Sequence, residues 1–340
     1  MRCSAYVENR ERGEEMRVLI VGGTSFVGRA IARAANEAGH DVTVINRGQT
    51  PSDLPNSVTR LIGDRGRDLS ALANQSFDVT IDAIAYQPHE VALLRDALAG
   101  RGGHYIQISS VSAYQDPDHE DATEDELRLI AEAPSDPQVA VNAATYGPMK
   151  AACEGAAHDY FGDQVTIVRP TFVIGSHDVT LRFPYWVERI GRGGDVAIPE
   201  PHTNALQYVD ARDLGSFVVV LAEHGTVGEF HVAGPFPGPT YLHVMEGVRK
   251  RVGPNGTNLI PVNLELITDQ HLEGKFPLSS GERSDNVLRI NSAKAVAAGL
   301  ALRDLEESVD DVIAWWNHRE WPHWWLKPEA EEALLRAARA

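Results

Sequence analysis

The stretch RVLIVGGTSFVG, residues 17–28, decides the fold of this chain. It opens on a short apolar run, residues 17–22, typical of a strand that is buried on both faces of a parallel sheet. From residue 26 the apolar side chains recur at helical spacing up to Gly39, a natural helix C-cap. Residues 41–46 (DVTVIN) return to a strand pattern. The segment therefore predicts a β–α–β unit with a right-handed crossover.

The alternation of strand and helix patterns continues along the chain. We expect further strands at 58–62, 78–83, 104–109, 165–169 and 229–233, helices near 89–99, 148–161, 292–300 and 304–319, and a strand leading into a helix over 205–222. This rhythm predicts an α/β fold, a doubly wound parallel sheet of the Rossmann type. The predicted organisation is a disordered extension (1–15), a dinucleotide-binding Rossmann domain (16–175), a smaller interwoven C-terminal substrate lobe with returning Rossmann elements (176–328) and a helical tail (329–340).

Composition narrows the function classes. The 340 residues carry a formal net charge of −17, which disfavours nucleic-acid binding because phosphate backbones are repelled. Two cysteines and 13 histidines show no ligand spacing, so we predict no metal site. No run of 18 apolar residues occurs, which predicts no membrane span and a cytoplasmic protein.

The glycine-rich turn between the first strand and helix points to a bound anion. Gly22 allows a tight turn, and Gly28 lets the helix approach the strand closely. The backbone N–H groups at the helix start then face a pyrophosphate. At the end of the second strand, Asn46 and Arg47 stand where an acidic residue would hold the ribose 2′-hydroxyl of NAD. Because an arginine suits a 2′-phosphate, we expect NADP(H) as the preferred cofactor, with NAD(H) as the alternative.

Three further residues suggest proton-transfer chemistry. Tyr146 and Lys150 are four residues apart and share one helix face, and the ammonium is expected to lower the pKa of the phenol. Pro148 between them places the pair in the first helical turn. Ser110 follows the strand at 104–109, at the sheet edge where ligands of open α/β sheets bind. Its hydroxyl is placed to hydrogen-bond a substrate oxygen.

Taken in this order and spacing, these elements resemble the extended short-chain dehydrogenase/reductases, the NAD-dependent epimerase/dehydratase superfamily. The resemblance runs from about Met16 to about Arg319. It implies Ser110, Tyr146 and Lys150 as catalytic residues. The cofactor-binding residues that it and the glycine turn imply are Gly22, Thr24, Ser25, Phe26, Val27, Gly28, Asn46, Arg47, Asp64, Ala83, Ala85, Tyr86, Lys150 and Pro170. Ser25 stands where the family's middle glycine usually is, and a homodimer is the usual family arrangement.

Departures from the family pattern narrow the reaction. Val111 and Ser112 replace the acidic pair of sugar dehydratases, so dehydration is not expected. Phe172 stands where many nucleotide-sugar enzymes have an asparagine. The candidate substrate-contacting residues are Ser112, Phe172, His177 and Arg283. The leading hypothesis is an NADPH-dependent carbonyl reductase acting on a small sugar-like or secondary-metabolite molecule. An NAD(P)-dependent sugar epimerase and a non-catalytic cofactor-binding regulator are the alternatives.

Overall fold

The computed structural model describes residues 14–134, 136, 139–279, 286–316 and 320–339. The extension predicted over residues 1–15 lies almost entirely outside these ranges and stays a prediction. No helix among the described residues has the length and apolar character that crossing a membrane requires.

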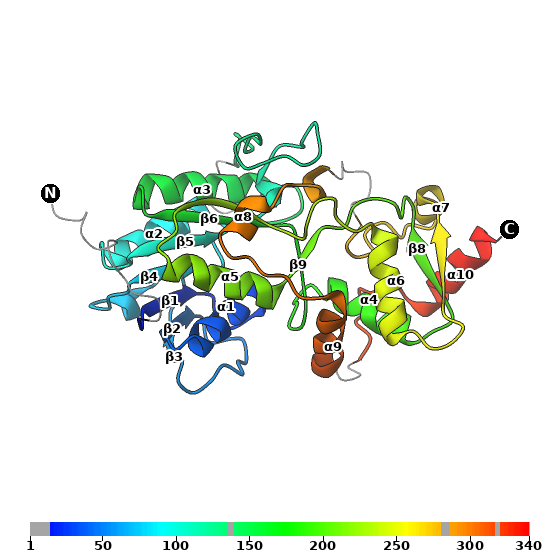
Figure 1. Ribbon diagram of the computed structural model, residues 1–340, viewed down its shortest axis with the longest axis horizontal. Coiled ribbons are helices and arrows are strands. Elements are labelled where there is room, and N and C mark those ends of the chain that lie inside the picture. Colours follow the sequence, from blue (N-terminus) through cyan, green and yellow to red (C-terminus); the bar gives the residue numbers. More distant parts are fainter. Residues whose placement is uncertain (1–13, 135, 137–138, 280–285, 317–319, 340) are drawn as a thin grey trace.

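The main sheet has seven parallel strands in the order β10-β6-β5-β4-β1-β2-β3 (Figure 1), which confirms the predicted doubly wound α/β fold. Its strands are β1 (Arg17–Val21), β2 (Asp41–Asn46), β3 (Thr59–Ile62), β4 (Val79–Asp82), β5 (His104–Ile108), β6 (Val165–Pro170) and β10 (Gly228–Val232). Every residue of β4, β5 and β6 is buried, as the continuous apolar runs predict. The order reverses beside β1, so the carboxyl ends of β1 and β4 open a crevice for a ligand.

Helices cover both faces of this sheet and build two separate apolar cores. One face carries α1 (Phe26–Glu37), α5 (Ala211–Glu223) and α8 (Ala293–Ala297), and the other carries α2 (Pro88–Leu98) and α3 (Tyr146–Phe161). A Cβ on Gly215 of α5 would lie 2.8 Å from the Ala30 carbonyl carbon of α1. Glycine at this position therefore allows the two helices to touch. Short 3₁₀ turns lie at Ser70–Leu72, Val111–Ala113 and Asn286–Leu288.

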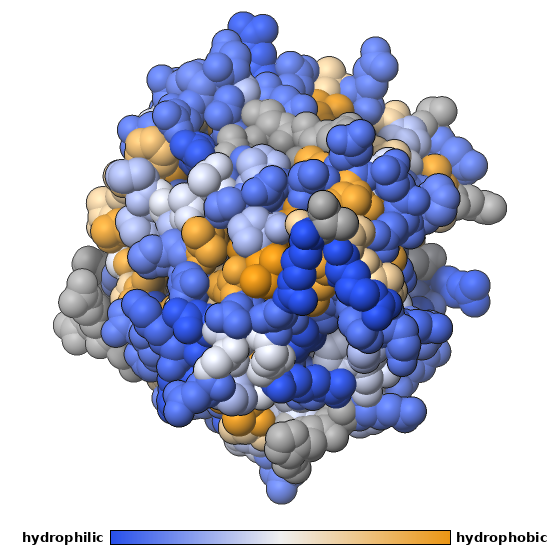
Figure 2. Space-filling model, turned by 90° about the vertical axis from the view of Figure 1, so that its right-hand side faces the viewer, coloured by the Kyte–Doolittle hydropathy of each residue, from blue (hydrophilic) through white to orange (hydrophobic). Residues whose placement is uncertain are grey.

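A second lobe at the other end of the molecule has its own apolar core (Figure 1). It contains α4 (Arg182–Gly191), β8 (Asp195–Pro199), α6 (Tyr241–Val252), β11 (Asn258–Val262), α7 (Leu264–Asp269), α9 (Leu305–Trp316) and α10 (Pro328–Ala338). The parallel pair β7 (Phe172–Ile174) and β9 (Tyr208–Asp210) joins it to the sheet. Trp186, Trp316 and Trp325 are buried in this core, so these tryptophans serve packing. The outer end of the lobe is mostly hydrophilic, with an apolar area near its centre (Figure 2).

Candidate active site

The glycine turn after β1 has the geometry that its sequence predicts. Gly22 adopts φ +96°, and a Cβ there would lie 2.7 Å from the Ile84 side chain. A Cβ on Gly28 would lie 3.1 Å from the Gly22 carbonyl oxygen. Both positions therefore exclude a side chain, and the start of α1 comes close to the end of β1. This arrangement leaves a cradle of backbone N–H groups open to an anion.

Ser25, which replaces the middle glycine of the family pattern, fits the turn without backbone strain. Ser25 has φ −139° and ψ 142°, an extended conformation that any residue adopts. The unusual backbone lies one residue later, because Phe26 has φ +38°. Thr24 and Ser25 line the cavity beside the turn, whereas Phe26 and Val27 pack against the sheet core. The latter two therefore offer backbone rather than side-chain contacts to a ligand.

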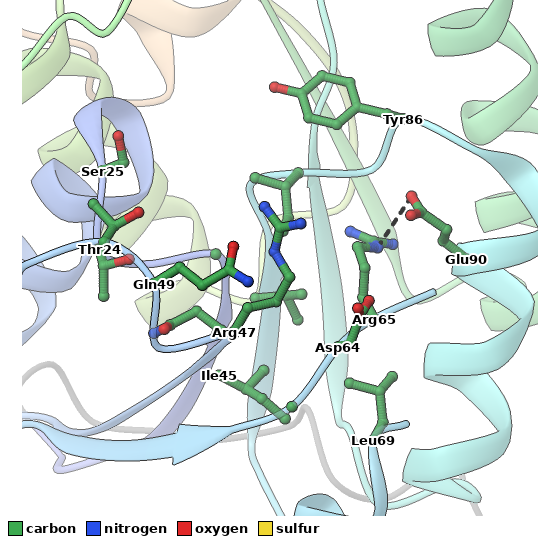
Figure 3. A pocket seen from close by; sticks show the side chains of 16 residues that line it. Thr24, Ser25, Ile45, Arg47, Gln49, Asp64, Arg65, Leu69, Tyr86 and Glu90 are labelled. Atoms are coloured by element: carbon green, nitrogen blue, oxygen red, sulfur yellow. Dashed lines mark ion pairs between the residues drawn. The ribbon is translucent and has the colours of Figure 1, made fainter. Parts of the chain in front are cut away.

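A cavity of about 340 Å³ opens in front of this turn, at the carboxyl ends of β1, β2 and β4 (Figure 3). Its lining includes five predicted cofactor residues besides Thr24 and Ser25, namely Gly22, Asn46, Arg47, Asp64 and Tyr86. Figure 3 shows the guanidinium groups of Arg47 and Arg65 extending toward the middle of the cavity. The residues predicted to hold a dinucleotide thus converge from four separate loops.

The two arginines of this cavity differ in their partners. Arg65 binds both carboxylate oxygens of Asp82, at 2.5 and 2.9 Å, and its Nε lies 3.3 Å from Glu90. Burial raises the pKa of Glu90, and Arg65 opposes that rise. Arg47 is exposed, and no carboxylate among the described residues lies within ion-pair distance of it. Arg47 is therefore a cation available to a ligand, whereas Arg65 serves the fold.

Lys150 is fixed between the cofactor cavity and the sheet edge. Its ammonium donates hydrogen bonds to the carbonyl oxygens of Ala85 (3.0 Å) and Ile108 (2.8 Å), and the residue is only 2% exposed. The same ammonium lies 4.6 Å from the ring centre of Tyr86 and 5.9 Å from that of Tyr146. Lys150 thus connects the loop after β4, the end of β5 and the start of α3.

Tyr146 and Ser110 meet at this edge. Tyr146 is the first residue of α3, and Pro148 lies in the first helical turn, as predicted. The Ser110 hydroxyl accepts a hydrogen bond from the Ser112 amide at 3.1 Å, which fixes the turn after β5. The Ser110 side chain also lies close enough to Tyr146 to lower the pKa of its phenol. The three predicted catalytic residues therefore lie together beside the cofactor cavity.

Burial raises the pKa of the Tyr146 phenol above its ordinary value. The Ser110 side chain and the positive charge of Arg182 oppose this rise. The sequence predicts that Lys150 lowers this pKa, and the structure assigns that effect to other groups. Lys150 is held by two backbone carbonyls and faces the ring rather than the hydroxyl, which explains the difference. Without a ligand, Tyr146 is therefore a neutral proton donor at pH 7.

A second cavity, of about 690 Å³, lies on the outer side of Tyr146 and is bordered by Ser112 and Arg182. Phe172 lies beneath the Arg182 guanidinium, 5.4 Å from ring centre to carbon. His177 lies elsewhere, in a cleft with Asp53 and Trp315. Of the predicted substrate residues, Ser112 therefore lines the Tyr146 cavity and Phe172 contacts it only through Arg182. His177 does not reach this cavity. Arg283 falls outside the described residues.

The remaining predicted cofactor residues surround Lys150 and the glycine turn. Ala83 faces Gly28, Ala85 is buried and Pro170 ends β6. With this geometry, the chain matches the family model described as the NAD dependent epimerase/dehydratase family over residues 18–234, more than half of its length. The chain belongs to that family. Its family match is to NAD-dependent proteins of the short-chain dehydrogenase/reductase type.

Relatives of this family member have diverse names. It is 24% identical to 2'-dehydrokanamycin reductase of Streptomyces kanamyceticus, over 89% of this chain and 85% of that protein. It is 25% identical to the chloroplast stem-loop binding protein of 41 kDa b of Arabidopsis thaliana, over 65% of this chain. The match spans 59% of that relative. A solved UDP-N-acetylglucosamine 4-epimerase from Bacillus cereus shares the fold, with a TM-score of 0.66, 17% identity, and coverage of 92% of this chain and 100% of the epimerase.

A buried charged network below the site was not predicted from the sequence. Arg169 of β6 contacts Glu154 of α3 at 2.7 Å, Glu229 at 2.6 Å and the Tyr114 hydroxyl at 2.6 Å. Glu154 in turn accepts a hydrogen bond from Ser109, the neighbour of Ser110. Both Arg169 and Glu154 are at most 1% exposed. The network ties α3, which carries Tyr146 and Lys150, to the two strands beneath it.

Proposed function

We propose that this family member is an NADPH-dependent reductase of a carbonyl group in a small sugar-like or secondary-metabolite molecule. The observation that carries the proposal is the convergence of Ser110, Tyr146 and Lys150 between the cofactor cavity and the outer cavity. Dehydration lacks support, because Val111 and Ser112 leave no acidic pair beside Ser110.

The residues present fit a dinucleotide. The cradle at Gly22 and Gly28 admits no side chain, and Arg47 provides a positive charge where the adenosine ribose would lie. Bound NADPH supplies the hydride that reduces the carbonyl carbon. Tyr146 then donates its proton to the carbonyl oxygen, and Ser110 donates a hydrogen bond to the same atom. Lys150 would hold the nicotinamide ribose, and it fixes the loops that border the site.

The NADPH preference depends on Arg47. We expect Arg47→Ala to weaken NADPH binding about tenfold and to leave NADH binding nearly unchanged, because only NADPH has a 2′-phosphate. Fluorescence titration of the purified protein with each nucleotide measures this. Arg33→Ala removes a half-buried arginine of α1, which pairs with Glu37, and is the control. Equal losses for both nucleotides would refute the preference.

The raised pKa of Tyr146 predicts the pH dependence of reduction. The proton donor must be protonated, and its pKa lies above its ordinary value of about 10. We therefore expect kcat/KM for carbonyl reduction to stay level through neutral pH and to fall only in strongly alkaline solution. Arg182 opposes the rise, so Arg182→Ala moves the alkaline limb to still higher pH. A limb that begins near pH 7 in the unaltered protein would contradict this picture.

An epimerase is the second candidate, since the family description and the Ser110, Tyr146 and Lys150 set suit it equally. An epimerase oxidises and re-reduces one carbon and so keeps its cofactor through many turnovers. Two results would favour the epimerase. The purified protein would retain tightly bound NAD, and Arg47→Ala would change neither the NADH affinity nor the NADPH affinity. Exchangeable NADPH supports the reductase.

A further inference from the structure

Arg182 is the positively charged group of the outer cavity, and the proposed chemistry gives it no contact with the substrate. It is the first residue of α4, in the second lobe, and its side chain is half-buried. The residue lines the same cavity as Ser112 and Tyr146. Its positive charge opposes the rise in the pKa of the Tyr146 phenol, which faces the same cavity.

Arg182 has no carboxylate within 4.0 Å among the described residues, although the chain carries a net charge of −17. Asp116 borders the same cavity, but its carboxylate lies more than 4.0 Å from the Arg182 guanidinium. Other arginines of the fold are paired: Arg65 with Asp82, Arg169 with Glu154, Arg189 with Glu331, Arg212 with Asp210 and Arg303 with Asp213. A half-buried guanidinium without a carboxylate is costly unless a ligand supplies the anion.

The guanidinium is also held in a fixed orientation. Its Nε donates to the Thr180 hydroxyl at 2.8 Å, and Thr180 donates to the buried Asp178 at 2.6 Å. Phe172 supports its flat face. These contacts leave the two terminal nitrogens, Nη1 and Nη2, available for a ligand. Their fork matches the two oxygens of a carboxylate.

A phosphate fits this place less well. Asp178 accepts hydrogen bonds from the backbone N–H groups of Thr180 and Arg182, so the first turn of α4 does not offer its amides to a ligand. No second cation lines the cavity in the described part of the chain. One guanidinium balances one negative charge, which is that of a carboxylate at neutral pH.

We propose that Arg182 is a specificity-determining residue that binds a carboxylate of the substrate, so that the protein acts on carbonyl compounds that also carry a carboxylic acid. This inference rests on the proposed reductase function. It assigns the reacting carbonyl to Tyr146 and Ser110, and the carboxylate to Arg182, which lines the same cavity as Tyr146.

The test compares keto acids with their methyl esters. Pyruvate, acetoacetate and levulinate place the carboxylate at increasing distance from the carbonyl, and each ester has the same skeleton without the charge. We expect kcat/KM for NADPH oxidation to favour the acid of best-fitting length over its ester. Arg182→Ala should reduce turnover of that acid roughly 10- to 100-fold more than it reduces turnover of the ester. Arg182→Lys, which keeps the charge but loses the fork, should be intermediate, and Arg192→Ala at the end of α4 is the control.

Ligand-observed NMR titration of the same acids without cofactor separates the two proposals. Acid binding that Arg182→Ala weakens, with no carbonyl reduced by any variant, supports the carboxylate site and overturns the reductase. Equal handling of acid and ester by the unaltered protein, or an acid preference that survives Arg182→Ala, overturns the carboxylate site. If the esters are still reduced in that case, the reductase proposal remains supported.

Discussion

Tyr146→Phe is expected to lower kcat/KM for carbonyl reduction roughly 10²- to 10⁴-fold, the usual contribution of a positioned proton donor. The substitution keeps the ring that packs 6.3 Å from the Tyr86 ring centre and removes only the hydroxyl. NADPH affinity should change little, because the cradle at Gly22 and Gly28 and the positive charge of Arg47 stay in place. The loss should therefore fall on the chemical step and not on cofactor binding.

Steady-state kinetics together with NADPH titration measure the two effects separately. Tyr160→Phe removes a phenol hydroxyl from the same helix α3, where Tyr160 is 38% exposed and its ring lies beneath Arg95. This control should keep full activity. A Tyr146→Phe enzyme that stays within a few-fold of the unaltered rate would show that another group protonates the carbonyl oxygen, and the assigned role of Tyr146 would be wrong.

The first half of the fold was predictable because it depends on local patterns. The segment from β1 to β2 combines a continuous apolar run, a helical period and a glycine turn, and the structure places each within a few residues of its predicted bounds. Tyr146 and Lys150 were also accessible, since their spacing and Pro148 placed them in the first turn of α3.

The second lobe was harder to predict. The segment 177–186 contains Pro184 and Leu181, whose φ is +54°, and no helix was predicted there. In the structure, Phe183, Tyr185 and Trp186 belong to α4 and pack into the core of the lobe. The buried positions 183, 186, 187 and 190 recur at helical spacing, so the helix itself was accessible from the sequence, whereas the core that covers it was not.

The charged partners of the site depend on long-range contacts. Arg65 meets Asp82 across the sheet, 17 residues away, and Arg182 reaches Tyr146 from the other lobe. The spacing of these residues in the sequence predicts neither contact, because the first depends on the order of the strands in the sheet and the second on the packing of the two lobes. One signal was available for Arg169, since a charged residue inside a predicted buried strand requires a buried partner. Long-range contacts also explain why the predicted effect of Lys150 on the pKa of Tyr146 was wrong, because two backbone carbonyls from distant segments hold the Lys150 ammonium.

Arg169→Met is expected to lower the free energy of unfolding by about 3–5 kcal/mol, the cost of leaving a buried carboxylate without its partner. Glu154 is fully buried, with Ser109 as its other hydrogen-bond donor among the described contacts. Glu229 is partly exposed and can turn to water, so the loss falls mainly on Glu154. Urea unfolding followed by circular dichroism measures the change.

The double variant Arg169→Met/Glu154→Leu decides whether the pair stabilises the fold or only avoids a penalty. Replacing both charges with apolar side chains removes the unpaired carboxylate, so much of the lost stability should return. Arg336→Met breaks an exposed pair with Glu332 and should cost less than about 1 kcal/mol, which controls for loss of an arginine as such. A double variant as unstable as Arg169→Met alone would show that the hydrogen bonds to Tyr114 and Ser109 carry the effect. The contacts of Arg169 and Ser109 with Glu154 join the strands beneath Ser110 to the helix that carries Tyr146, so the position of the proposed proton donor depends on this network.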